Sequence, residues 1–255
     1  MKYILVIAGS DSCGGAGIQA DIKTITGLGA HALTAITALT AQNSLGITAI
    51  HKVPARFISK QLEAIMDDLI PDAVKIGMLY SKTAVMEVAR LIKKHGLPNV
   101  VLDPVLSAST GRHLLEPKAL SLLKEVLIPI TSVVTPNLYE AEILADLKVW
   151  GPSEMANAAK VIRKMGPDVV ITGGHLEGEC MDLLYDGSDF HRFCGSRINT
   201  KHTHGSGCVF STALATYLTH EKDVVKASKL AHEFTRCAII NGYACGRGPG
   251  PVQPG

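Results

Sequence analysis

The sequence predicts an α/β fold: a doubly wound, mostly parallel sheet with helices on both faces. Three observations indicate it. Short Val-, Ile- and Leu-rich runs recur, segments of helical period separate them, and small, polar or acidic residues follow the runs. Continuous apolar runs are typical of parallel strands covered on both faces. Strand and helix alternate along the chain, which favours this fold, and one domain spanning 1–255 is the simplest organisation.

Each element follows from local patterns. Five apolar runs are predicted strands, at 3–8, 73–79, 100–106, 132–135 and 169–172. Segments with apolar residues on one helical face are predicted helices, at 55–69, 81–96, 153–166, 207–221 and 223–241. We expect Gly96 to end the second of these helices and Ser153 to cap the third. Segments 181–186 and 190–198 are expected to form a hairpin, and the Gly/Pro-rich tail 246–255 is expected to be irregular.

Composition excludes several functional classes. A formal net charge of +2 without a Lys/Arg run argues against nucleic-acid binding. No run of 18 apolar residues is present, so we expect no membrane span. The apolar stretch 3–8 is too short for a signal-peptide core, so we expect no secretory segment. The six cysteines show no CxxC spacing, which favours reduced thiols in a cytoplasmic protein. No His/Cys/Asp spacing resembles a zinc site, and most histidines are expected at the surface or in satisfied core positions.

The segment THGSGC at 203–208 is the strongest motif, because an apolar helical run follows it. Glycines on both sides of Ser206 permit a tight turn, and free amides at a helix N-terminus bind anions. A helix N-terminus also stabilises a thiolate, so Cys208 is expected to accept a proton near neutral pH. An anion hole beside a base is what phosphoryl transfer needs. The alternative is a helix-start turn followed by a buried cysteine.

The Gly-rich segment 9–17 follows a strand and opens a helix, but it matches neither the Walker A loop nor the dinucleotide fingerprint. A tight turn explains it equally well. Asp21 lies one turn into the helix, where its carboxylate is expected to receive a substrate amine or hydroxyl.

Two further motifs have both a structural and a functional interpretation. Asn137 and Glu140 fit a capping box, and they also fit the surroundings of a water-bridged Mg²⁺. Asp103 at a strand end is either a turn anchor or a residue that orients Mg²⁺ or phosphates. Met66, Met78 and Met86 are expected to fill core gaps, and of these only Met78 lies at a strand end.

Together these motifs resemble the hydroxymethylpyrimidine/phosphomethylpyrimidine kinase family of thiamine biosynthesis, within the ribokinase-like superfamily. The resemblance covers nearly the whole chain and keeps the family's order. It is carried by GSDSCGGAGIQADIKT at 9–24, TALTAQNSLGI at 37–47, DAVKIGML at 72–79, VLDPVLSASTG at 101–111, TPNLYEAEIL at 135–144, GGHLEGE at 173–179 and THGSGC at 203–208.

The resemblance implies an ATP- and Mg²⁺-dependent phosphotransferase that is cytoplasmic and homodimeric, with a small pyrimidine alcohol or its phosphate as substrate. It implies Cys208 as the catalytic base, with an anion hole at Gly205, Ser206 and Gly207. It implies a pyrimidine site at Asp21, Gln42 and Met78, with Gly9 and Val105 close by. It implies ATP and phosphate contacts at Asp103, Asn137, Thr172 and Gly174, and Mg²⁺ at Asp103 and Glu140, through water.

The chain departs from the family pattern in four places. Thr172 stands where the family usually has a lysine, which bears on whether the second phosphorylation occurs. The same Thr-Gly-Gly sequence is found in related pyridoxal kinases, so pyridoxal kinase is the alternative enzyme. Cys13 replaces a usual serine, Ser206 replaces a usual threonine, and the tail lacks a frequent histidine after Gly-Pro-Val. A non-catalytic pyrimidine- or nucleotide-binding regulator is a third hypothesis, against which the intact Cys208, Asn137 and Glu140 argue.

Overall fold

One mixed sheet runs through the protein, as the computed structural model shows for residues 1–108, 110–174, 176, 178 and 180–255. Its strand order in the described residues is β3-β2-β1-β4-β5-β6-β7-β8-β9. The strands are β1 Tyr3–Asp11, β2 His31–Asn43, β3 Gly46–Lys52, β4 Ala73–Ile76, β5 Val100–Leu102, β6 Val133–Val134, β7 Asp168–Ile171, β8 Cys180–Tyr185 and β9 Phe190–Gly195. The six neighbouring strands β2, β1, β4, β5, β6 and β7 are parallel. Strand β3 pairs antiparallel with β2 at one end of the sheet, and β8 and β9 pair antiparallel at the other end.

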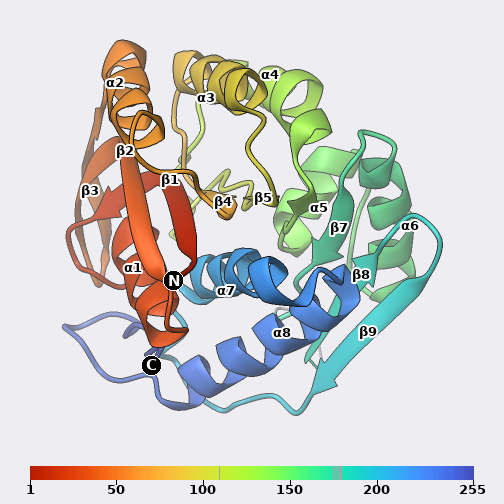
Figure 1. The fold of residues 1–255 in the computed structure, drawn as a ribbon. Coiled ribbons are helices and arrows are strands. Elements are labelled where there is room, and N and C mark those ends of the chain that lie inside the picture. The colour runs from red at the N-terminus through yellow and green to blue at the C-terminus, as the bar shows by residue number, and fades with distance from the viewer. Residues whose placement is uncertain (109, 175, 177, 179) are drawn as a thin grey trace.

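Helices cover both faces of the sheet (Figure 1). They are α1 Gly17–Gly27, α2 Ala55–Met66, α3 Lys82–His95, α4 Leu120–Leu122, α5 Leu138–Ala145, α6 Pro152–Arg163, α7 Ser206–Glu221 and α8 Val224–Ile240. Successive side chains of each central strand point to opposite faces of the sheet. Leu5 and Ile7 belong to the core cluster on the face covered by α2, α3 and α6, whereas Ile4 and Val6 belong to the cluster on the face covered by α1, α7 and α8. None of the helices described is long and apolar enough to cross a bilayer.

The predicted fold class is confirmed, and all five predicted strands and the hairpin are present. Gly96 ends α3 with a left-handed φ of 57°, as expected. The cap prediction for Ser153 is wrong, because Gly151 is the N-cap and Pro152 occupies the first helical position. The strand and helix predictions at 73–79, 100–106 and 55–69 extend past the observed ends at Ile76, Leu102 and Met66.

The pair β2 and β3 is absent from the sequence-based prediction. Residues 31–43 are rich in small Ala and Thr side chains, so they lack the strong apolar signal of the other strands. Their strand character comes from pairing: β2 lies parallel to β1 on one side and antiparallel to β3 on the other. This pair carries Gln42 to the edge of the sheet where the other candidate site residues collect.

Because β1, β4, β5, β6 and β7 are parallel, their carboxyl ends meet at one edge of the sheet. In open α/β sheets, ligands bind beyond this edge. The helix α7 begins here and runs buried beneath the sheet, where Val209, Ala213 and Leu214 have no exposure. Helix α7 is thus held firmly, with its N-terminus among the strand ends.

Candidate active site

Gly205 caps the N-terminus of α7, and this position requires glycine for two reasons. Its φ is 85°, in the left-handed region. A Cβ atom here would lie 1.9 Å from the carbonyl oxygen of Gly15, which no side chain tolerates. The two Gly-rich loops that the sequence singled out therefore pack directly against each other, backbone on backbone.

The start of α7 presents unpaired amides. The Ser206 N–H donates to the Thr203 carbonyl at 3.2 Å, so this amide of the predicted anion hole is engaged. The N–H groups of Gly207 and Cys208 have no hydrogen-bond partner among the described residues, as is usual in a first helical turn. Gly207 is exposed. Two free amides and the positive end of the helix dipole thus form an anion-binding corner.

The Cys208 thiol lies beside this corner and is partly exposed. We expected the helix N-terminus to stabilise its thiolate, but the structure corrects this. Burial raises the pKa of Cys208 to about 12, Lys75 opposes that effect, and the carboxylates of Asp21 and Asp103 add to it. The local loop pattern could not show the two carboxylates, because they come from other elements of the fold.

A cluster of buried charged side chains lies next to Cys208. Lys75 on β4 has no exposed side-chain area, and its Nζ lies 2.9 and 3.0 Å from the carboxylate oxygens of Asp21 and 4.0 Å from Asp103 Oδ2. Burial alone would lower the pKa of Lys75, but the attraction of Asp21, Cys208 and Asp103 raises it, so the ammonium stays charged. Sequence reasoning missed Lys75, although a lysine within an apolar strand was an available signal.

Asp21 has different partners from those expected. Its carboxylate is completely buried and accepts hydrogen bonds from Lys75 and from the Thr212 hydroxyl at 2.6 Å. These contacts occupy the oxygens that were predicted to receive a substrate amine. Asp21 therefore holds Lys75 and α7 in place.

Asp103 and Glu140 form a pair of buried carboxylates. Ser211 on α7 donates to Asp103 Oδ2 at 3.2 Å, and Glu140 accepts from the amides of Leu106 and Asn137 at 3.3 and 3.0 Å. Burial, and then the charge of Asp103, raises the pKa of Glu140 to about 8. The capping box of Asn137 and Glu140 is confirmed.

This donor set fits a cation held through water. Two mutually repelling carboxylates attract a divalent ion, and Mg²⁺ prefers oxygen ligands and keeps several of its waters. No group of three or more His, Cys, Asp or Glu side chains that would enclose a metal is present in the described residues. A directly enclosed metal site is thus not part of that region, and the carboxylate pair remains the candidate position.

The predicted nucleotide-binding residues come together in part. Asn137 and Thr172 lie side by side in a short parallel bridge, with the Thr172 N–H bonded to the Pro136 carbonyl at 2.9 Å. Gly174 is exposed, and its carbonyl accepts from Arg197 at 3.0 Å. The rest of the predicted GGHLEGE motif includes 175, 177 and 179, which lie outside the described residues, as does 109 in the motif 101–111.

An apolar wall brings together three of the predicted pyrimidine-binding residues. Met78 packs with Ala38 and Leu114, and Val105 lies against the same cluster. Gly9 is adjacent, because a Cβ atom there would lie 2.9 Å from the Met78 sulfur. Tyr80 borders this cluster with a φ of 64°, a left-handed value that is uncommon for a bulky residue.

Gln42 reaches the site edge through a polar network that sequence reasoning did not find. His204 Nε2 lies 3.3 Å from Gln42 Nε2 and 3.1 Å from Asp11 Oδ2. Burial opposes ionisation of Asp11, but hydrogen bonds from His204 and from the amides of Cys13 and Ala16 lower its pKa. The network joins both Gly-rich loops to β2, and its members are far apart in sequence.

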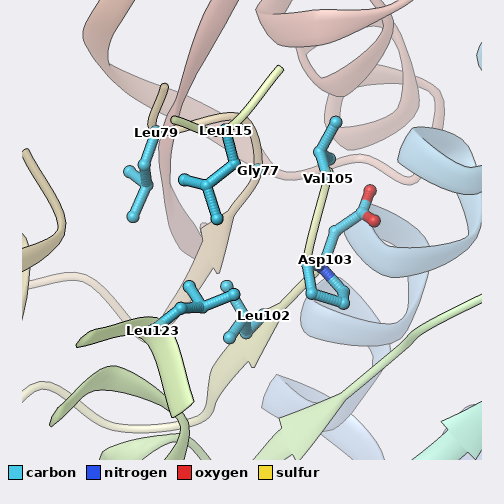
Figure 2. A pocket seen from close by; sticks show the side chains of 8 residues that line it. Gly77, Leu79, Leu102, Asp103, Val105, Leu115 and Leu123 are labelled. Carbon is cyan, nitrogen blue, oxygen red and sulfur yellow. The ribbon is translucent and has the colours of Figure 1, made fainter. Parts of the chain in front are cut away.

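A small pocket lies behind Asp103, lined by Gly77, Leu79, Leu102, Asp103, Pro104, Val105, Leu115 and Leu123. Its volume of about 10 Å³ is only enough for one water molecule. Figure 2 shows the Asp103 carboxylate pointing away from these apolar side chains, on the side of α7. The pocket is thus packing space behind the candidate site, and it is too small for a substrate.

Comparison with known proteins identifies the family of the chain. The sequence profile of the family described as phosphomethylpyrimidine kinase matches residues 11–253. The chain belongs to this family. It is 44% identical over 252 residues to the hydroxymethylpyrimidine/phosphomethylpyrimidine kinase of Bacillus subtilis, covering 98% of this chain and 93% of that one. Members of the family are named as kinases, which are phosphotransferases.

Two further similarities extend the picture of the family. The chain is 43% identical over 252 residues to the thiamine biosynthesis bifunctional protein ThiED of Geobacter sulfurreducens, covering 98% of this chain and 51% of that protein. It therefore spans about half the length of this longer relative. A crystal structure of Bacillus subtilis pyridoxal kinase with ADP superposes with a TM-score of 0.93 at 37% identity, covering 100% and 97% of the chains. The predicted ribokinase-like fold is confirmed.

The buried cluster predicts a strong effect of Lys75 on stability. We expect Lys75→Met to lower the free energy of unfolding by about 3–5 kcal/mol, because Asp21 is left charged without its cation. Lys75→Met combined with Asp21→Leu should recover most of this loss. The matched control is Lys2→Met, which removes the surface pair with Asp72 and should cost no more than about 1 kcal/mol. Urea denaturation measures all three, and equal losses for Lys75→Met and Lys2→Met would contradict the cluster's role.

The raised pKa of Glu140 predicts that this residue makes a pH-dependent contribution to the stability of the fold. Its pKa is about 8 in the fold, above the usual value near 4.5, so the folded state binds more protons than the unfolded state between these values. Stability then falls as pH rises through this window, by at most about 1.4 kcal/mol per pH unit. Glu140→Gln keeps the capping box and removes the titration. In chelator-treated buffer, the free energy of unfolding of the variant minus that of wild type should increase steadily from pH 5 to 8. A constant difference would refute the assignment.

Proposed function

We propose that this protein transfers the γ-phosphoryl group of ATP to 4-amino-5-hydroxymethyl-2-methylpyrimidine, to its monophosphate, or to both, in thiamine biosynthesis. The observation that carries the proposal is the start of α7, where the free amides of Gly207 and Cys208 adjoin the Cys208 thiol. Family membership supports the substrate class. We treat residues 1–255 as one kinase domain.

Each group has a defined task in this proposal. The Cys208 sulfur, as thiolate, takes the hydroxyl proton while the alcohol oxygen attacks the γ-phosphorus and ADP leaves. The amides of Gly207 and Cys208 hold the phosphoryl oxygens, and the α7 dipole adds to their attraction. Lys75 offsets the burial of the thiolate and so favours the basic form of Cys208. Most of the rate acceleration comes from positioning and electrostatics.

The substrate groups are assigned to two sides of α7. Met78, Val105 and Gly9 provide an apolar wall for the pyrimidine ring, and the Gln42 amide both donates and accepts hydrogen bonds at the ring's polar edge. Asn137, Thr172 and Gly174 are assigned to ATP, and the structural relative with bound ADP supports nucleotide use by this fold. Asp103 and Glu140 would hold Mg²⁺ through water, where the ion would neutralise phosphate charge.

Pyridoxal kinase is the second candidate. The superposition with a pyridoxal kinase and the Thr172-Gly173-Gly174 sequence favour it. The family profile, the 44% identical relative, Gln42 and Met78 favour the pyrimidine. A cytoplasmic homodimer is part of the proposal. The exposed apolar residues Leu39 and Leu45 of the β2–β3 region support it as a contact surface.

Product analysis tests the substrate. The protein is incubated with Mg-ATP and, separately, with the hydroxymethylpyrimidine, its monophosphate and pyridoxal, and the products are identified by mass spectrometry. We expect the pyrimidine monophosphate or diphosphate to form. Pyridoxal phosphate as the sole product would replace the main assignment by the alternative, and the absence of ADP with all three acceptors would favour a non-catalytic regulator.

Cys208→Ala tests the mechanism. Removing the base should lower kcat by roughly 10²–10⁴-fold while ATP binding, measured by calorimetry, stays close to wild type. The wild-type rate should rise with pH, because a thiol of pKa about 12 gains thiolate as pH increases. The residual rate of the variant should lack this rise. Near-wild-type turnover in the variant would remove Cys208 from the mechanism.

A further inference from the structure

Asp182 on β8 joins two segments that meet only in the folded chain. One oxygen of its carboxylate accepts from the Gly173 amide at 3.0 Å, and the other lies 2.7 Å from Nδ1 of His232 on α8. Because a carboxylate only accepts, His232 donates through Nδ1. Helix α8 lies against β8 and β9 (Figure 1). Asp182 thus connects α8 to the segment after β7, which carries the predicted nucleotide contacts Thr172 and Gly174.

Gly173 lies directly against β8. A Cβ atom at this position would lie 2.0 Å from the Met181 carbonyl oxygen and 2.8 Å from Cδ1 of Leu176, so a side chain would require the backbone to move. The Gly173 carbonyl accepts from the Leu176 amide at 3.0 Å, while its own amide donates to Asp182. Both backbone polar groups of Gly173 are therefore engaged, and the residue has a fixed place beside β8.

Arg197, which follows β9, holds the next residues from the other side. Its guanidinium donates to the Gly174 carbonyl at 3.0 Å and also to the Leu176 carbonyl. The Gly174 amide has no hydrogen-bond partner among the described residues, and no described atom lies within 4 Å of a Cβ atom built at this position. The segment thus presents a backbone donor in an open position, with fixed neighbours on both sides.

His232 is an unusual choice for its position in the core. The residue is buried beside Phe193, yet its Nε2 atom has no hydrogen-bond partner in the described part of the chain. The buried Ser228 hydroxyl, one turn earlier on α8, has none there either. A buried polar atom without a partner lowers stability. An apolar ring would fill this position at less cost, so the hydrogen bond to Asp182 is what requires histidine.

We propose that Asp182 is a positioning residue for the nucleotide and that His232 orients its carboxylate. The bond from His232 fixes the rotation of the carboxylate, and the carboxylate in turn fixes Gly173, so that Gly174 is held where ATP binds. In the sheet, β5 and β6 separate β7 from β4, after which the apolar wall residue Met78 lies. The pair should therefore affect the nucleotide and leave the acceptor site unchanged. This inference rests on the proposed function, which assigns Gly174 to ATP.

The same hairpin contains a matched control. Asp186 Oδ2 lies 3.1 Å from Nε2 of His191, and Asp186 Oδ1 accepts from the amides of Ser188 and Asp189, both at 2.8 Å. Here too an aspartate joins a histidine to backbone amides. This second pair lies at the turn after β8, near the start of β7, whereas Gly173 follows the end of β7. Asp186→Ala thus removes a similar set of bonds away from the site edge.

Calorimetry with Mg-ADP on the full-length protein tests the positioning role. We expect Asp182→Ala to raise the Kd for ADP roughly tenfold, the effect of one lost hydrogen bond. Asp182→Asn should recover most of the affinity, because its amide oxygen still accepts from Gly173 and its NH₂ group can donate to the other tautomer of His232. Asp186→Ala should bind ADP as wild type does. Unchanged affinity in Asp182→Ala, or an equal loss in Asp186→Ala, would overturn the proposal.

His232→Phe keeps the test decisive if Asp182→Ala does not fold. Phenylalanine retains the ring volume and removes both nitrogens, so the melting temperature should stay close to that of wild type while the Kd for ADP rises severalfold. Wild-type ADP affinity in a folded His232→Phe would overturn the role of His232. A loss of affinity in Asp182→Asn equal to that in His232→Phe would also contradict the proposal, because the conservative variant keeps the bond to Gly173.

Steady-state kinetics separate nucleotide positioning from a general loss of structure. Asp182→Ala should raise the KM for ATP about tenfold and leave the KM for the acceptor close to wild type. Equal increases in both KM values, or a lower kcat with an unchanged KM for ATP, would count against nucleotide positioning. If wild type phosphorylates none of the three acceptors, the proposed function fails, while the ADP affinities of the variants still decide this inference.

Discussion

Lys75 has no contact with solvent, and its ammonium is a charge that several elements of the site share. It is carried by β4, bonds to Asp21 of α1, and lies near Asp103 after β5 and Cys208 at the start of α7. Leaving any of these groups without a partner in the interior is costly, so their positions are coupled. The cluster thereby fixes where α7 begins relative to the strand ends, and the anion-binding corner depends on it.

Backbone contact complements this electrostatic constraint. The Gly15 carbonyl and Gly205 touch so closely that a methyl group would not fit between them. The Asp11 carboxylate accepts hydrogen bonds from the amides of Cys13, Gly15 and Ala16 and also contacts His204. The first and last functional loops of the chain therefore behave as one structural unit, and the C-terminal tail packs on it.

Much of the fold was predictable because burial on both faces leaves a strong local signal. The strands around Leu5, Val74 and Val101 could be predicted from their continuous apolar runs alone. The strand pair β2–β3 left no comparable signal, since small Ala and Thr residues become a strand only through pairing with β1. Among site residues, Met78, Val105 and Gly9 lie together as expected. Asp21 is fully buried, and its oxygens accept hydrogen bonds from Lys75 and Thr212, which spacing along the chain did not show.

The sequence by itself determined the strands with continuous apolar runs, the glycines that permit the turn before α7, and the capping box of Asn137 and Glu140. These depend on neighbours within a few residues, so local pattern suffices. Only the tertiary structure decided the charge environment of Cys208, the partners of Asp21, and the network of Asp11, Gln42 and His204. Each of these depends on burial and on groups distant in the chain, and neither can be read from spacing along a sequence.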